Sequence, residues 1–100
     1  MINRKQLAID FAQSLNHPEI EKIILFGSVA RGEDSEDSDI DILIITNDKS
    51  KIADEVYSKV GEIILELGEY LSVKIMRKDN YEKVKDSYIL STIEKEGILI

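Results

Sequence analysis

The fold is decided by four consecutive segments: IEKIILF (residues 20–26), GSVARG (27–32), EDSEDS (33–38) and DIDILIIT (39–46). The first and last segments are apolar runs of strand length, and glycines bound the second, which predicts a turn. The third is polar throughout and predicts an exposed loop. Alternation along the second strand places Asp39, Asp41 and Leu43 on one face and Ile40, Ile42 and Ile44 on the other.

Apolar spacing on either side of this stretch predicts helices between the strands. Leu7, Phe11 and Leu15 recur every four residues, which indicates an amphipathic helix within residues 3–16 that ends before Pro18. Asn3 and Gln6 are spaced as a capping box at its start.

The remainder of the chain repeats the alternation of helix and strand. We expect a helix capped by Asn47, Asp48 or Ser50 and ended by Gly68, a strand over 70–76 and helical turns over 81–93. The apolar tail at 98–100 completes the sheet or pairs with a partner strand. This order predicts a single α/β domain over residues 1–100, with a mixed sheet of three or four strands and helices covering one face.

Composition limits the chemistry of any site. The chain has no cysteine and one histidine, His17, so a bound metal would be held by oxygen ligands, as Mg²⁺ is. Its formal net charge is −7, from 20 acidic and 13 basic residues, which disfavours binding to a nucleic-acid backbone. No apolar run is long enough to span a bilayer and no signal-peptide pattern is present, so we expect a cytoplasmic protein.

Four residues around the turn form the candidate site. Gly27 has no Cβ and lets the backbone approach a phosphate closely, and Ser28 adds a hydroxyl donor at a helix start. Asp39 and Asp41, two residues apart on a strand, project from the same face and can share a divalent ion. Taken alone, a Gly-Ser turn or an Asp-x-Asp strand end is common without such a function.

Two other phosphate or metal motifs are excluded by single positions. The spacing from Gly27 to Gly32 is that of a P-loop, but Glu33 and Asp34 stand where Lys and Ser or Thr are required. The acidic run also has the spacing of a calcium-binding EF-hand loop, but Ile42 stands where that loop requires glycine.

The conjunction of Gly-Ser, Ala-Arg-Gly and Ser-Asp-x-Asp before an apolar strand resembles the minimal nucleotidyltransferase family, within the DNA polymerase β-like superfamily. The resemblance implies that Gly27 and Ser28 contact a nucleoside triphosphate, and that Asp39 and Asp41 bind Mg²⁺ and serve catalysis. Arg31 suits a phosphate contact or the anchoring of the acidic loop, and equally a structural ion pair with Glu33, Asp34 or Asp37. Ser38 is placed with the nucleotide-binding residues, although its position also suits a turn.

The resemblance also implies a further acid on the third strand, where this sequence has none. Ser72 or Lys74 stands at the corresponding place, and Glu69 could substitute only if the strand register allows it. The implied function is Mg²⁺-dependent transfer of a nucleotidyl group, AMP from ATP, to a hydroxyl of a HEPN-family protein, as an antitoxin. The alternative is a weak or inactive nucleotide-binding module that neutralises a HEPN toxin by forming a complex.

Overall fold

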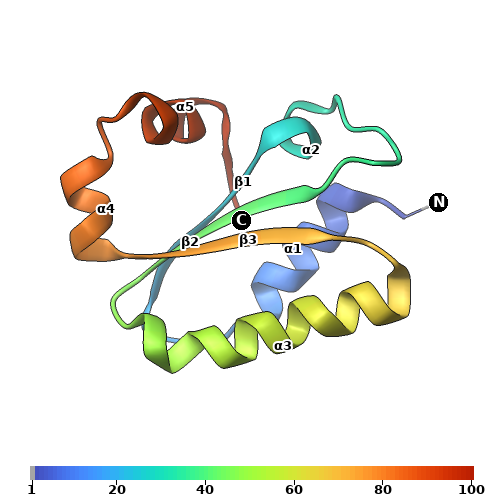
Figure 1. Cartoon of the computed structure of the whole chain (residues 1–100), viewed down its shortest axis with the longest axis horizontal. Helices are drawn as coiled ribbons and strands as arrows, with labels where there is room; N and C mark the ends of the chain where they lie inside the picture. Colours follow the sequence, from blue (N-terminus) through green and yellow to red (C-terminus); the bar gives the residue numbers. More distant parts are fainter. Residues whose placement is uncertain (1) are drawn as a thin grey trace.

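The computed structural model describes residues 2–100 as one four-stranded sheet with helices packed on it (Figure 1). The elements in chain order are α1 (Arg4–Ser14), β1 (Ile20–Phe26), α2 (Gly27–Arg31), β2 (Ile40–Thr46), α3 (Lys49–Leu67), β3 (Leu71–Arg77), α4 (Lys78–Val84), α5 (Tyr88–Glu96) and β4 (Ile98–Leu99). The strand order is β3-β2-β1-β4. β1 is antiparallel to β2 and β4, and β2 is parallel to β3, so the predicted mixed α/β sheet is confirmed.

The first helix begins and ends for local reasons. Asn3 caps α1, because its side-chain oxygen accepts a hydrogen bond from the Gln6 backbone N–H at 3.0 Å. The second half of the expected capping box is wrong, since the Gln6 amide donates instead to the Asp10 carboxylate at 2.9 Å. The helix ends at Ser14, before the His17-Pro18 pair, where proline cannot continue it.

The connection from β2 through α3 to β3 makes these two strands parallel and neighbouring. Asp48 occupies the N-cap position of α3 as predicted, but its side chain makes no capping hydrogen bond and accepts instead from the Ser50 hydroxyl at 2.7 Å. Gly68 follows α3 in the left-handed conformation with φ of 70°. The predicted glycine stop is confirmed, because this conformation is strained for a residue with a Cβ. The predicted helical turns between residues 81 and 93 form two helices, α4 and α5, separated by a short turn.

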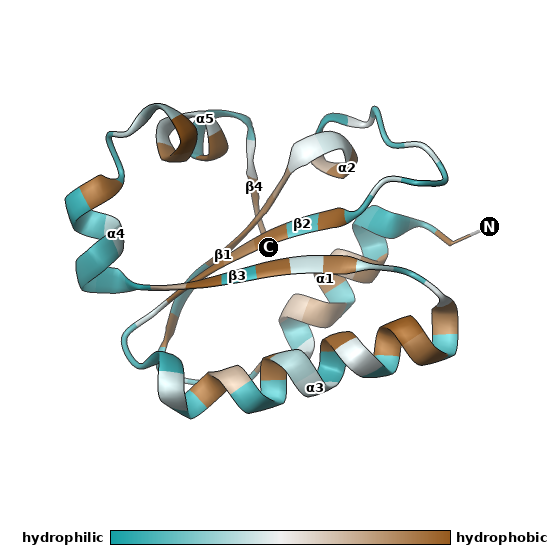
Figure 2. Ribbon diagram, viewed as in Figure 1, coloured by the Kyte–Doolittle hydropathy of each residue, from teal (hydrophilic) through white to brown (hydrophobic). Residues whose placement is uncertain are grey.

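The expectation that helices cover one face of the sheet is wrong. α1 and α3 pack on the face that carries Ile40, Ile42 and Ile44, where Val29 of α2 joins the same core, and α4 and α5 pack on part of the opposite face (Figure 1). The reason is that the strands are apolar on both sides, as the largely brown ribbons of β1 and β2 show (Figure 2). A second core therefore forms between the sheet and the last two helices, from Ile24, Leu43, Ile45, Tyr81 and Leu90.

The C-terminal tail completes the sheet, as predicted. Ile98 pairs with Leu25 and Leu99 pairs with Ile24, and the backbone N–H of Ile100 donates to the Ile23 carbonyl at 2.9 Å. Within residues 2–100, none of the helices has the length and apolar character that crossing a membrane requires.

Candidate active site

The site is built at the point where β1 ends and α2 begins. Gly27 has φ of 76°, which lets the chain turn sharply from the strand into the helix. Phe26 pairs with Asp41 across the sheet, which brings Asp41 directly beside Gly27. A Cβ on Gly27 would overlap the Asp41 carboxylate oxygen Oδ2 and would lie 3.1 Å from its Cγ. Glycine is therefore required here both by the backbone conformation and by the aspartate that packs against it.

Asp39 and Asp41 lie at the start of β2, with Asp39 just before the strand and Asp41 within it. Burial raises the pKa of the Asp41 carboxyl, the negative charge of Asp39 raises it further, and the positive charge of Arg31 partly lowers it. The two carboxylates are thus close enough to repel each other, and a divalent cation shared between them would relieve that repulsion. Their oxygen atoms fit a hard ion such as Mg²⁺.

The parallel register of β2 and β3 decides what stands beside these aspartates. Asp41 is paired with Ser72, and Leu43 is paired with Lys74. Both Ser72 and Lys74 are exposed and share the face of Asp41. Glu69 is excluded as a third acid, because it precedes the strand and forms an ion pair with Arg4 at 2.9 Å. Accordingly, residues 2–100 contain no cluster of three acidic or histidine side chains able to hold a metal.

Arg31 and Ser38 both make structural contacts in this structure. The Arg31 guanidinium forms ion pairs with Glu33 at 3.1 Å and with Glu96 at 3.6 Å, which ties α2 to the end of α5. The Ser38 hydroxyl accepts a hydrogen bond from the Ser35 backbone N–H at 2.9 Å and so closes a turn. The structural readings of both residues are confirmed, and their contacts with a nucleotide stay predictions, as does that of Ser28.

Sequence reasoning missed Arg4 as a contributor to this site. The Arg4 guanidinium donates to the carboxylates of Glu69 and Asp34 and to backbone carbonyls of the acidic loop. A signal was present, because a cation in the first turn of a helix is unfavourable to the helix dipole. Arg4 opens α1 with no acidic residue in that turn, so a compensating partner elsewhere in the fold was to be expected.

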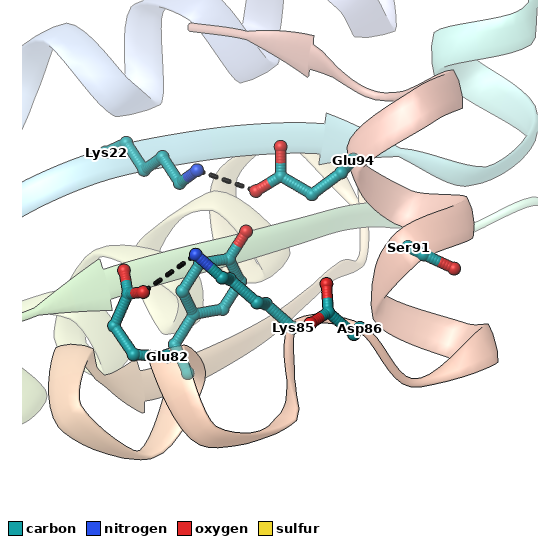
Figure 3. Close-up of a pocket in the computed structure, with 7 residues that line it drawn as sticks. Lys22, Glu82, Lys85, Asp86, Ser91 and Glu94 are labelled. Atoms are coloured by element: carbon teal, nitrogen blue, oxygen red, sulfur yellow. Dashed lines mark hydrogen bonds and ion pairs between the residues drawn. The ribbon is translucent and has the colours of Figure 1, made fainter.

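A hollow of about 370 Å³ lies between β1, α4 and α5, away from Asp39 and Asp41 (Figure 3). Lys22 in this hollow pairs with Glu94 at 2.6 Å, and Lys85 pairs with Glu82 at 2.9 Å. Both lysines are therefore neutralised by neighbours within the hollow, and Lys22 stands near the start of β1, at the end away from Gly27. The hollow has no counterpart to the glycine turn and the two neighbouring carboxylates found at Gly27, Asp39 and Asp41.

Comparisons with known proteins show the family to which the chain is similar. The model of the nucleotidyltransferase domain family matches residues 6–100. Two proteins of Methanocaldococcus jannaschii, each named "putative protein adenylyltransferase", are 33% identical over 81 residues and 31% identical over 81 residues. The alignments cover 80% and 81% of this chain and 78% and 77% of the relatives. A crystal structure named as a putative nucleotidyltransferase from Sulfolobus solfataricus is 22% identical, covers 97% of this chain and 75% of that one, and has a TM-score of 0.45.

The chain belongs to the nucleotidyltransferase domain family. It is a nucleotidyltransferase enzyme whose α/β domain places Gly27 against Asp41 at the end of β1.

Proposed function

We propose that the chain transfers AMP from ATP, with Mg²⁺, to a hydroxyl group of a protein acceptor and releases pyrophosphate. The observation that carries the proposal is the packing of Gly27 against Asp41, beside Asp39. Family membership supports nucleotidyl transfer. The names of the two archaeal relatives support adenylyl as the transferred group and a protein as its acceptor.

Each residue of the site has a separate role in this reaction. Asp39 and Asp41 would hold Mg²⁺, which would supply positive charge that offsets the negative charge of the triphosphate. The N–H groups that open α2 after Gly27 would bind phosphate oxygens, and Ser28 adds a hydroxyl donor. The acceptor hydroxyl gives up its proton to solvent as its oxygen bonds to the α-phosphorus and the bond to pyrophosphate breaks. The catalytic contribution of the chain is therefore positioning and charge stabilisation.

The acceptor we propose is a HEPN-family protein, with the chain acting as its antitoxin in the cytoplasm. The support for this partner is the resemblance of residues 27–41 to minimal nucleotidyltransferases, many of which resemble antitoxins encoded beside HEPN-domain toxins. The names of the archaeal relatives, which specify a protein acceptor, are consistent with it.

A second function is favoured by one observation, the cation on β3. Lys74 lies on the face of Asp41 where the family resemblance implies an acid. A lysine can attract phosphate but cannot bind a metal ion through its ammonium group. The chain would then bind nucleotide with weak or no transfer, and would neutralise a HEPN toxin by complex formation alone.

Labelled ATP separates the two functions. The protein is incubated with ATP, Mg²⁺ and the HEPN-domain protein encoded beside it, and label on that protein is measured. The same assay is run with Asp39→Ala/Asp41→Ala and with Asp54→Ala, a control on the exposed surface of α3. Transfer by the wild type and the control but not by the double variant supports the enzyme. Complex formation by all three proteins without any transfer would establish the second function instead.

A further inference from the structure

We propose that Arg4 is a positioning residue for Asp39, because it holds the acidic loop that leads into that carboxylate. The proposal rests on the proposed function, in which Asp39 binds the metal ion. Arg4 opens α1, which packs on the face of the sheet opposite to Asp41 (Figure 1). Arg4 lines one hollow with Ser38, Asp39 and Glu69, and its contacts there are with the acidic loop and with Glu69.

The Arg4 guanidinium is shared among four acceptors. Its Nε donates to Glu69 Oε2 at 2.9 Å, and its Nη1 donates to Asp34 Oδ2 at 3.1 Å. Nη1 also donates to the Ser35 carbonyl, and Nη2 donates to the Glu36 carbonyl at 2.8 Å. The Arg4 side chain is only 14% exposed, and its bond to Glu69 is partly buried, whereas its three bonds to the acidic loop are exposed.

Two of these contacts fix the loop backbone itself. Residues 33–38 carry four carboxylates, whose mutual repulsion favours an open, disordered loop. Bonds from Arg4 to the carbonyls of Ser35 and Glu36 oppose this by tying down the chain as well as a side chain. The Ser38 backbone N–H then donates to the Ser35 carbonyl at 3.0 Å. Asp39 follows immediately after this anchored turn.

Arg4 also ties down the segment on the other side of Asp39. The backbone N–H of Ile40 donates to the Tyr70 carbonyl at 2.9 Å, and Tyr70 follows Glu69, the partner of Arg4. One guanidinium therefore joins the loop before Asp39 to the segment that pairs beside it. This requires arginine, since its planar group offers several donors in fixed directions, whereas lysine offers a single point charge on a flexible stem.

The test uses Arg4→Met and Arg4→Lys, with Lys5→Met as the matched control. Lys5 is the exposed neighbour of Arg4 on the same helix, so its substitution removes an equal charge. Amide hydrogen exchange is measured at Ser38, in the anchored turn, and at Ile44, in the core of the sheet. Mn²⁺ affinity is measured separately, without nucleotide. We expect faster exchange at Ser38 alone and an approximately 10-fold loss of Mn²⁺ affinity in Arg4→Met. Arg4→Lys should fall between it and the wild type, and Lys5→Met should match the wild type.

Each other result overturns the proposal. Unchanged exchange at Ser38 would show that Arg4 does not hold the turn, and faster exchange with unchanged Mn²⁺ affinity would show a structural role only. Faster exchange at Ile44 as well as Ser38 in the milder Arg4→Lys would mark a general loss of stability. A wild-type protein that binds no Mn²⁺ would refute the proposed metal site, and the positioning role with it. Failure of the proposed metal site is thus distinguishable from failure of the Arg4 proposal, because it is seen in the wild type without any Arg4 variant.

Discussion

Replacing Gly27 with alanine tests whether Asp41 is packed against the backbone as the site requires. Three glycines of the described chain have nearly the same positive φ: 76° at Gly27, 72° at Gly32 and 70° at Gly68. A Cβ added to Gly32 or Gly68 meets no heavy atom within 4 Å, whereas one added to Gly27 overlaps the Asp41 carboxylate. The three substitutions therefore share one conformational cost and differ in a single contact.

The expected magnitudes follow from these two terms. The left-handed conformation costs an alanine about 1–2 kcal/mol, partly offset by about 0.4–1 kcal/mol because alanine restricts the unfolded chain. Gly32→Ala and Gly68→Ala should each lower the free energy of unfolding by about 1 kcal/mol. Gly27→Ala adds the displacement of a packed neighbour, about 1–3 kcal/mol, and should lose about 2–4 kcal/mol in total. That is a large share of the roughly 5–15 kcal/mol typical of a native domain.

The assay is urea unfolding followed by circular dichroism, on the wild type, the three glycine-to-alanine variants, Asp41→Ala and Gly27→Ala/Asp41→Ala. Removing the Asp41 carboxylate should restore part of the stability lost in Gly27→Ala, with a coupling energy of about 0.5–3 kcal/mol between the two positions. If Gly27→Ala is no less stable than Gly32→Ala, the carboxylate is not held against the backbone. The reasoning that places the candidate site at this contact would then be refuted.

Three further substitutions test the electrostatics of the site and the packing of the rest of the fold. Burial raises the pKa of the Asp41 carboxyl in the folded state. The contribution of Asp41 to the free energy of unfolding is therefore fully present below its unfolded-state pKa and is lost as the pH rises through its folded-state pKa. The thermal stability of Asp41→Asn relative to the wild type should therefore increase from acid to neutral pH. A difference that does not grow over this range would contradict the raised pKa of Asp41. Thr46, fully buried, donates to the Glu19 carbonyl at 2.9 Å, so Thr46→Val should cost about 1 kcal/mol in a urea titration, and no loss would show that this bond contributes nothing. A Cβ on Gly97 would clash with the backbone oxygen of Ile93, so Gly97→Ala should cost about 1–3 kcal/mol and speed amide exchange in β4; a neutral result would show that this turn can move.

Features that depend on residues close together in the sequence were predictable from the sequence. The two faces of β2 follow from the alternation of side chains along an extended chain, which needs no partner strand. The Asn3 cap, the end of α1 before Pro18 and the left-handed Gly68 follow from properties of single residue types. The positions of Gly27, Asp39 and Asp41 within the turn and strand were likewise readable from the segment between residues 20 and 46.

Features that depend on distant residues were decided by the tertiary structure alone. The β2–β3 register, which sets Ser72 beside Asp41 and removes Glu69 from the site, depends on how the α3 connection packs. Arg4 reaches Glu69 across 65 positions of sequence, a pairing that no local pattern encodes. The sequence by itself determined which side chains face each way, since bond geometry and local hydrogen bonds act over a few residues. Only the folded chain decided which of these side chains meet, because that depends on burying both faces of the sheet at once.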